Sequence, residues 1–275
     1  MQSEPKRLSN WEIELENLFN VSCSTRLGSL SQQLVIRCYE SVTSTMDLAR
    51  ENLALVSDEE PLLILAKNQT KGRGRQGRVW NAADEGFYGT YAFKTNLAVQ
   101  SLTGLSLAVG CVLCDCLKLY TTEIGLKWPN DVLSKAGEKL CGVLIELFQS
   151  QNQQYVLVGI GINLLGKPEL INETSSLFDL SGKVISPVEL AGIISPKLID
   201  AWSLFIEKGF SEFKNRWQDD ALFLGKQFSV SFSDSPNSNQ NISGTFVGVD
   251  KTGALLLENS EGKITITAGH ILSIS

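Results

Sequence analysis

The segment Gln69–Trp80 constrains the fold of this chain more than any other part of the sequence. It holds three glycines, four cationic side chains and a tryptophan, although the whole protein has a formal net charge of −6. Glycine permits backbone conformations that other residues avoid, and arginine donates forked hydrogen bonds to carboxylate and phosphate oxygens. The apolar runs Pro61–Lys67 and Gly86–Lys94 flank the segment and are typical of buried strands. The sequence therefore predicts a flexible loop between two core strands that closes around an anion.

The composition is that of an ordinary globular protein. Of the 275 residues, 43% are hydrophobic and 20% charged, enough for one large domain or a large domain with a smaller one. The acidic net charge argues against a general affinity for nucleic acid or anionic membranes. The N-terminal residues are polar, and the longest apolar stretch, around Leu105–Leu119, is interrupted by Asp115 and Lys118. We therefore expect a cytoplasmic protein, with an organelle interior reached by other means as the alternative.

Hydrophobic periodicity predicts both helices and strands over residues 36–224. An extension of residues 1–35, with one helix near 11–19, precedes them. Strands are predicted at residues 33–40, 61–67, 86–94, 124–128, 139–148 and 155–164, the last three forming an antiparallel meander. Helices are predicted at residues 43–55 (capped by Thr43 or Ser44), 101–120, 187–209 and 211–223. Ser186, Pro187 and Glu189 form a strong start for the third helix, and Pro196 predicts a kink or break in it.

After Gly225 the pattern changes to short alternating runs separated by Ser, Asn and Gly. Five such runs, at residues 227–232, 244–249, 254–258, 263–267 and 271–274, predict a small all-β barrel over residues 225–275. The hydrophilic stretch Ser233–Asn241 is predicted as a hairpin loop, and the domain boundary is placed near Leu224.

The cysteines raise the question of a metal site. Cys111, Cys114 and Cys116 lie close together in sequence, but within a helical apolar pattern, and the single histidine, His270, is remote from them. Small buried core residues are the favoured interpretation, with metal or redox chemistry as the alternative. No metal-ligating residue is predicted.

The glycines Gly72, Gly74 and Gly77 satisfy the G-x-G-x-x-G spacing of dinucleotide-binding folds. That pattern also needs a helix directly after the third glycine, and here Arg78-Val79-Trp80 leads into a loop. A dinucleotide site is therefore disfavoured, while a plain solvent-facing loop stays as an alternative.

Three further clusters each have an ordinary interpretation. Lys127-Trp128-Pro129-Asn130-Asp131 can be a strand that exits into a turn, because proline ends a strand ladder. Gly159–Asn163 can be a strand over which another part of the chain packs closely, and Ser44-Thr45 can be a helix cap.

Together, however, these clusters occur in the order seen in biotin protein ligases, and the chain resembles that family over residues 38–275. The resemblance rests on Ser44-Thr45, Gln69–Trp80, Lys127–Asp131, Lys139–Glu146 and Gly159–Asn163. One departure is Met46, where the family usually has asparagine. The resemblance implies an α+β fold: a class II synthetase-like catalytic domain with a mixed, mainly antiparallel sheet, plus a small SH3-like C-terminal β-barrel. It also implies the short, monofunctional form without the DNA-binding domain.

The resemblance further implies a two-step reaction, in which biotin reacts with ATP to give biotinyl-AMP and a lysine of a biotin carboxyl carrier protein then takes the biotin. The implied catalytic residues are Lys127, Arg73 and Arg75. The implied biotin-binding residues are Ser44, Thr45, Gln69, Gly72, Arg73, Gly74, Arg75, Lys127 and Gly142. The implied ATP-binding residues are Arg75, Arg78, Trp80, Asn130 and Asn163. Mg²⁺ is expected on the phosphates of ATP rather than in a protein cage.

Two alternatives remain. A lipoate ligase or octanoyltransferase shares the fold implied by the resemblance, but such families are expected to carry an Arg-Arg-x-Ser-Gly-Gly-Gly type motif. A nucleic-acid-binding module could use the basic loop and the barrel, which the acidic charge and the lack of repeated exposed aromatic residues oppose. The expected partner is thus the carrier domain of a carboxylase, with no nucleic acid and no membrane. A homodimer is left open.

Overall fold

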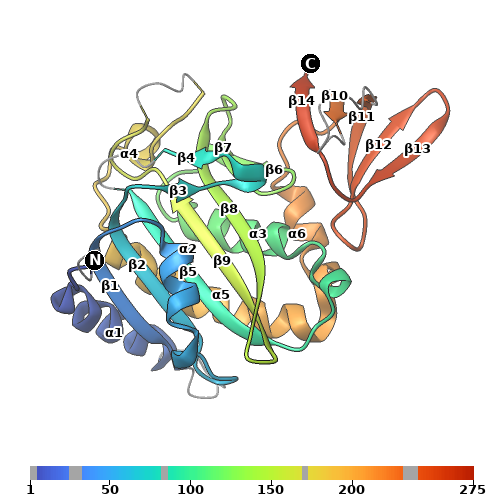
Figure 1. The fold of residues 1–275 in the computed structure, drawn as a ribbon. Helices are drawn as coiled ribbons and strands as arrows, with labels where there is room; N and C mark the ends of the chain where they lie inside the picture. Colours follow the sequence, from blue (N-terminus) through green and yellow to red (C-terminus); the bar gives the residue numbers. More distant parts are fainter. Residues whose placement is uncertain (1–4, 25–32, 82–85, 169–172, 232–240) are drawn as a thin grey trace.

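A seven-stranded sheet runs through the centre of the molecule in the order β1-β2-β5-β9-β8-β7-β6 (Figure 1). The computed structural model describes residues 5–24, 33–81, 86–168, 173–231 and 241–275. The strands are β1 (Val35–Val42), β2 (Leu62–Gln69), β5 (Phe87–Thr95), β6 (Ile124–Lys127), β7 (Asp131–Ser134), β8 (Lys139–Ser150) and β9 (Gln153–Ile162). Strands β1 and β2 pair in parallel and the remaining neighbours are antiparallel. The predicted mixed, mainly antiparallel sheet is confirmed.

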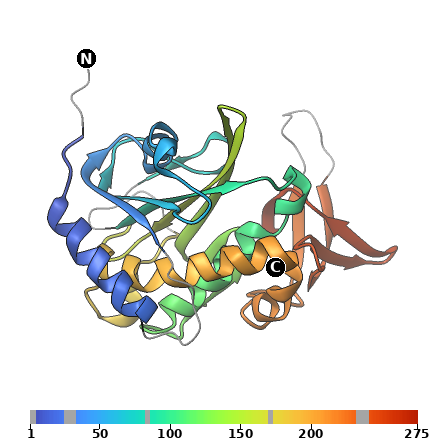
Figure 2. The ribbon, with the colours of Figure 1, turned by 90° about the horizontal axis from the view of Figure 1, so that it is seen from below.

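Helices cover both faces of this sheet because its central strands bury side chains on both sides. In β2, Leu63 and Leu65 belong to a core shared with α1 (Ser9–Ser24), α3 (Leu105–Leu117) and α5 (Pro187–Lys208). On the opposite side of β2, Leu62 and Ile64 pack in a second cluster with α2 (Thr45–Glu51). Figure 2 shows α1 and α5 along one face and α2 on the other. The sheet is thus held between two helical layers, which leaves its upper end in Figure 1 for the loops.

Helix α5 differs from its prediction at Pro196. Its start is confirmed, because Ser186 Oγ accepts a hydrogen bond from the Glu189 backbone N–H at 3.0 Å. The helix then runs without a break from Pro187 to Lys208 and ends at Gly209, whose φ is 69°. The predicted break is wrong because Pro196 is buried and the helix packs against α1 and α3. That packing offsets the hydrogen bond that a proline removes.

Three of the other helices are shorter than predicted, whereas α1 is longer than the helix predicted near residues 11–19. The predicted helix at residues 101–120 consists of a 3-10 turn, η3 (Val99–Leu102), and helix α3, separated by Gly104 at φ 85°. The segment Val99–Leu117 is long and apolar enough to cross a membrane, but 67% of it is buried inside the protein, where it packs as a core helix. The remaining short elements are η1 (Leu53–Leu55), α4 (Leu177–Ser181), η4 (Gly209–Glu212) and α6 (Lys214–Asp219).

The meander contains one strand more than predicted. Strand β7 pairs with β6 and with β8, and the turn Trp128–Asn130 joins β6 to β7. The run Asp131–Ser134 is too short to show a clear alternation, so the sequence predicts no strand there. Its position in the sheet is decided by the two strands on either side of it.

The C-terminal region forms a five-stranded antiparallel sheet in the order β13-β12-β11-β10-β14. The strands are β10 (Gln227–Ser231), β11 (Asn241–Val249), β12 (Leu255–Asn259), β13 (Gly262–Ile266) and β14 (His270–Ile274). Register shifts in β10 and β11 add curvature to the sheet, as expected of a small barrel. The predicted hairpin loop Ser233–Asn241 lies almost wholly outside the described residues.

This barrel shares its core with the larger sheet. Phe228 and Phe246 stack at 4.8 Å between ring centroids, and Phe246 meets the ring of Trp217 on α6 edge-on at 6.3 Å. Trp128 Nε1, in the β6–β7 turn, donates a hydrogen bond to the carbonyl of Gly253 at 3.0 Å. The barrel therefore lies directly beside the β6–β7 turn.

Candidate active site

The basic segment of the sequence folds into a small hairpin, which we call the glycine-rich hairpin (residues 72–80). It consists of β3 (Gly72–Arg73), the 3-10 turn η2 (Arg75–Gly77) and β4 (Val79–Trp80). The two short strands pair with each other, and Gln76 and Gly77 take left-handed φ values of 54° and 71° in the turn. A strand, and not a helix, follows Gly77, which contradicts a dinucleotide-binding loop.

The glycine-rich hairpin borders a cavity that all four sequence clusters line. Its wall contains Ser44, Thr45, Gln69, Arg73, Gly74, Arg75, Arg78, Trp80, Lys127, Asn130 and Gly142, all of them predicted site residues. It also contains Met46, Asp131, Lys139, Gly161 and His270, which the sequence did not assign to the site. The structure therefore brings together most of the predicted residues.

Two predicted residues, Gly72 and Asn163, lie beside this cavity. Gly72 pairs with Trp80 so closely that an added Cβ would lie 2.6 Å from the Trp80 carbonyl oxygen. Asn163 lines a neighbouring cavity that shares Trp80, Lys127 and Lys139 with the first. Its side-chain nitrogen donates to the Ser175 carbonyl at 3.0 Å, while its buried Oδ1 has no hydrogen-bond partner among the described residues.

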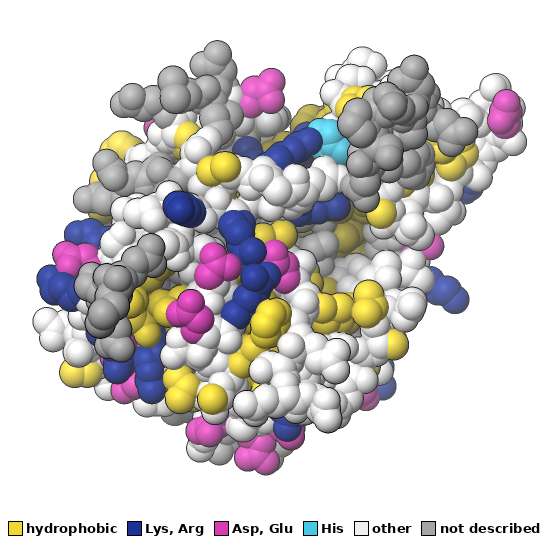
Figure 3. Space-filling model, viewed as in Figure 1, with side chains coloured by type: hydrophobic (Ala, Val, Ile, Leu, Met, Phe, Trp, Pro, Cys, Tyr) yellow, Lys and Arg dark blue, Asp and Glu magenta, His cyan; other side chains and the backbone are white. Residues whose placement is uncertain are grey.

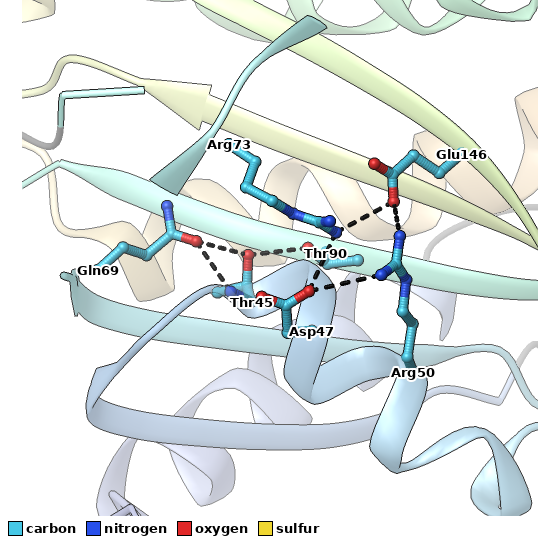
Figure 4. A network of polar contacts seen from close by, with 7 residues as sticks. All are labelled: Thr45, Asp47, Arg50, Gln69, Arg73, Thr90 and Glu146. Atoms are coloured by element: carbon cyan, nitrogen blue, oxygen red, sulfur yellow. Dashed lines mark hydrogen bonds and ion pairs between the residues drawn. The ribbon is translucent and has the colours of Figure 1, made fainter. Parts of the chain in front are cut away.

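One end of the cavity is polar and uncharged. Gln69 Oε1 accepts hydrogen bonds from the backbone N–H of Thr45 at 2.8 Å and from its hydroxyl at 3.1 Å (Figure 4). Thr90 in turn donates to the Thr45 hydroxyl at 2.8 Å. Ser44 occupies the N-cap position of α2 but makes no capping bond, and its buried Oγ has no partner within the described ranges. The side-chain cap predicted as the ordinary alternative is wrong, and the Ser44 hydroxyl is left for a ligand.

The floor of the cavity is a glycine pair. Gly142 on β8 and Gly161 on β9 face each other across the ladder, and the indole of Trp80 packs over both. An added Cβ would lie 2.9 Å from Trp80 Cζ3 at Gly142 and 2.6 Å from Trp80 Cε2 at Gly161. Only hydrogen at these two positions leaves room for the ring. Trp80 thereby separates the two cavities.

Four charged side chains form a network at the base of the glycine-rich hairpin (Figure 4). Arg73 lies 3.1 Å from both Asp47 Oδ1 and Glu146 Oε2. Arg50 of α2 pairs with the same two carboxylates. Two positive and two negative charges compensate one another, so the charge of Arg73 is already paired within the protein.

At the opposite end of the cavity, Lys139 is the one of three cations that forms an ion pair with a carboxylate of the described part of the chain. Arg75 donates to Asn130 Oδ1 at 3.2 Å, and burial lowers its pKa, although the carboxylate of Asp131 opposes this shift. Lys127, at the end of β6, makes no hydrogen bond or ion pair to a described residue. Lys139 pairs with Asp131 at 2.7 Å and lies 5.5 Å from the centre of the Trp80 ring. Arg75 and Lys127 thus present uncompensated positive charge to a ligand.

His270 is a site residue that the sequence did not reveal. It begins β14 of the barrel, lines the cavity, and has its Nε2 3.0 Å from Nη2 of Arg78, which is 192 residues earlier in the chain. Burial is the largest cause that lowers the pKa of His270, and nearby cations lower it further. The only hint in the sequence is that the chain has a single histidine. A local sequence pattern cannot indicate a contact between residues that lie 192 positions apart.

The cysteines take no part in this site. Cys111, Cys114 and Cys116 are buried in α3, as predicted for core residues, and burial raises the pKa of Cys111 and Cys114 to about 12. Among the described residues no cluster of three histidine, cysteine or carboxylate side chains could hold a metal ion.

Comparison with known proteins gives a consistent result. Residues 38–163 match the Biotin/lipoate A/B protein ligase family, and residues 236–272 match the Biotin protein ligase C terminal domain. A biotin–[acetyl-CoA-carboxylase] ligase of Paracoccus denitrificans is 30% identical over 76% of this chain and 88% of the relative. A bifunctional ligase/repressor of Bacillus subtilis is 29% identical over 94% of this chain and 77% of the relative. The biotin protein ligase of Aquifex aeolicus in complex with biotin and ATP superimposes with a TM-score of 0.72 and 30% identity, covering 89% of this chain and 99% of that one.

Proposed function

The chain belongs to the biotin protein ligase family, and on that basis we propose that it is an ATP-dependent enzyme that activates biotin as biotinyl-5′-AMP and transfers it to a lysine of a biotin carboxyl carrier protein. One observation carries the proposal beyond the family. A single cavity joins an uncharged polar end at Ser44, Thr45 and Gln69 to a cationic end at Arg75 and Lys127. Biotin is a neutral bicyclic urea with a carboxylate tail. Its ring fits the uncharged polar end of the cavity, and its carboxylate, next to the triphosphate of ATP, fits the cationic end.

We assign the polar end to the bicycle of biotin. Gln69 uses its oxygen on Thr45, which leaves its amide nitrogen to donate to the urea carbonyl. The unpartnered hydroxyl of Ser44 is suited to the same ring. Met46, buried beside Gly159, supplies apolar surface there rather than the polar contact that an asparagine would make. Gly74 and Gly142 permit close approach of the backbone.

We assign the cationic end to the reacting carboxylate and the phosphates. An oxygen of the biotin carboxylate attacks the α-phosphorus of ATP, the bond to the bridging oxygen breaks, and pyrophosphate leaves. Negative charge builds up on the α-phosphoryl oxygens, and Lys127 and Arg75 offset it without a further reorganisation of solvent. Arg78, Trp80, Asn130 and Asn163 are assigned to the nucleotide. ATP enters as its magnesium complex, so that the ion belongs to the substrate.

In the second step the amine of the carrier lysine attacks the acyl carbon of biotinyl-AMP. An amide bond forms, the bond between the acyl carbon and phosphate oxygen breaks, AMP leaves with that electron pair, and the amine releases one proton to solvent. The glycine-rich hairpin has the position of a lid that keeps water from the mixed anhydride in the meantime. Arg73, already paired with Asp47 and Glu146, contributes by fixing the base of this lid.

The direct test is a mass measurement. The protein is incubated with ATP, Mg²⁺, biotin and an apo biotin carrier domain, and the carrier is then weighed. A mass increase of one biotinyl group is expected, together with ATP–pyrophosphate exchange that depends on biotin and not on lipoate. Exchange driven by lipoate would instead support the lipoate ligase alternative, and no exchange with either acid would reject ligase activity.

We further propose that the protein acts in the cytoplasm, on a carrier protein and without nucleic acid or membrane. The formal net charge of −6 supports this, because an acidic protein has no general affinity for nucleic acid or anionic membranes. Sedimentation with and without biotin and ATP will decide whether a homodimer forms. We place the catalytic domain at residues 36–224 and the barrel at 225–275.

A further inference from the structure

Three arginines fasten the glycine-rich hairpin to three different parts of the molecule. Arg73 reaches the carboxylates of α2 and β8, and Arg75 reaches the turn between β6 and β7. Arg78 reaches the barrel, through Nε2 of His270 at 3.0 Å. The first contact is made by carboxylates and the second by an amide. The third depends on a side chain that changes its charge near neutral pH.

The chemistry of this third contact fixes the protonation of His270. A guanidinium group only donates hydrogen bonds, so Nε2 must accept and the ring proton must lie on Nδ1. The side chains that face the ring are Arg75 and Arg78 of the hairpin, Lys127 of β6 and Asp131 of β7. Figure 3 shows the histidine, in cyan, beside dark-blue cationic atoms. Burial and then the three cations lower the pKa of His270 below its ordinary value of 6.5, with Asp131 opposing.

We propose that His270 is a positioning residue for the ligase reaction: its neutral imidazole holds Arg78, so that the barrel keeps the glycine-rich hairpin closed over the bound intermediate. The inference rests on the proposed function. It assigns a role to His270, which lies outside the sequence motifs that suggested that function. It explains why the barrel lies against the β6–β7 turn, where Trp128 and Gly253 fix its position. His270 does not touch the reacting atoms and acts through Arg78.

The first experiment measures how fast biotinyl-AMP leaves the enzyme at about pH 7.5, where the imidazole is neutral. His270→Ala should release the intermediate about fivefold faster, the size expected for one lost hydrogen bond to a charged group at a partly exposed site. Arg78→Ala should release it at least as fast, because Arg78 is also assigned to the nucleotide. The double variant should release it no faster than the faster single variant, because both changes remove the same contact. Rates in His270→Ala equal to those of the unchanged protein, or two effects that multiply, would overturn the proposal.

The second experiment separates positioning from structure by means of pH. His270→Gln offers an oxygen acceptor that does not titrate. Biotin is used without nucleotide, so that no phosphate charge enters the site. Its release is followed by intrinsic tryptophan fluorescence between about pH 5.5 and pH 8. Burial and the nearby cations lower the pKa of His270 from its ordinary value of 6.5. The contact is therefore fully present above about pH 6.5 and is lost as the pH falls through the lowered pKa.

The unchanged protein should therefore release biotin faster at acid pH, while His270→Gln should show a flat profile and slow release throughout. Ser273→Ala, an exposed change on the same strand, is the matched control and should behave as the unchanged protein. An acid-dependent release that persists in His270→Gln would reject the inference. Failure of the unchanged protein to make biotinyl-AMP would reject the proposed function itself, and this inference with it.

Discussion

At the scale of single residues, the site divides into groups that the protein has already satisfied and groups that it has left free. Arg73 is paired with two carboxylates, and Thr45 and Gln69 are bonded to each other. Lys127 and the hydroxyl of Ser44 have no partner among the described residues. The unpartnered groups can form hydrogen bonds or ion pairs when a ligand binds. Their removal should therefore affect function more than folding.

Lys127→Ala should therefore reduce adenylate formation by roughly two to three decades, because one fixed charge at a developing anion is worth about 3–4 kcal/mol. Biotin binding should persist at reduced affinity, since the polar end of the cavity is unchanged. Single-turnover formation of biotinyl-AMP is the measurement, and Lys135→Ala, an exposed lysine on the β7–β8 turn, is the control. A rate within about threefold of the unchanged protein would remove Lys127 from the mechanism.

Gly161→Ala should displace the indole of Trp80, because the new Cβ would lie 2.6 Å from Trp80 Cε2. The ring cannot move toward Gly142, where an added Cβ would already lie 2.9 Å from Cζ3 of the same ring. We expect weaker nucleotide binding with near-normal biotin binding, as measured by calorimetry with each ligand. Unchanged nucleotide affinity would show that the position of Trp80 does not affect nucleotide binding.

At the scale of elements, the glycine-rich hairpin is the part whose behaviour depends most on its contacts. It has two short strands and almost no core, so its arginines decide whether it stays closed. Burial lowers the pKa of Arg75, which donates to Asn130 Oδ1 at the cationic end of the cavity.

Arg75→Gly should remove a clamp on the carboxyl and phosphate oxygens and add backbone entropy to a segment that must be ordered. We expect biotinyl-AMP to dissociate at least about tenfold faster, equivalent to roughly 1.4 kcal/mol of binding. The released intermediate should then acylate lysines of a bystander protein. Strictly carrier-specific labelling together with a normal dissociation rate would leave the lid role of the hairpin without support.

At the scale of the whole molecule, the barrel and the larger sheet share one core rather than touching at a surface. Trp217 of α6 packs on Phe246 of the barrel, and the segment after α6 adds backbone hydrogen bonds to β6 at Leu126. The sequence suggested a separate compact unit, whereas the structure shows that it completes the interior on that side.

Deleting residues from Gly225 onward should therefore lower the melting temperature as well as turnover, because Trp217, 2% exposed in the full chain, would lose its cover. Thermal denaturation of the shortened protein, followed with adenylate formation, measures both. Trp128→Phe, which removes only the bond to Gly253, should cost about 1 kcal/mol and keep the fold. An unchanged melting temperature in the shortened protein would show that the larger sheet folds independently.

Much of the fold could be predicted from the sequence because it depends on short-range patterns. The continuous apolar run Leu62–Ala66, the capping residues Ser186 and Glu189, and the five short runs after Gly225 each act within a few positions of the chain. The motif clusters likewise indicated most residues of the cavity, since their spacing and chemistry are local features.

The remaining features were decided by packing between distant parts of the chain. Helix α5 continues through Pro196 because it packs against α1 and α3. Gly142 and Gly161 are glycines because the ring of Trp80 packs directly over both. The partners of Arg73 and Arg78 come from other elements, and His270 joins the site from the last strand of the barrel. No periodicity records such pairs, because a contact across 192 residues depends on where two elements meet in space and not on the residues near either one.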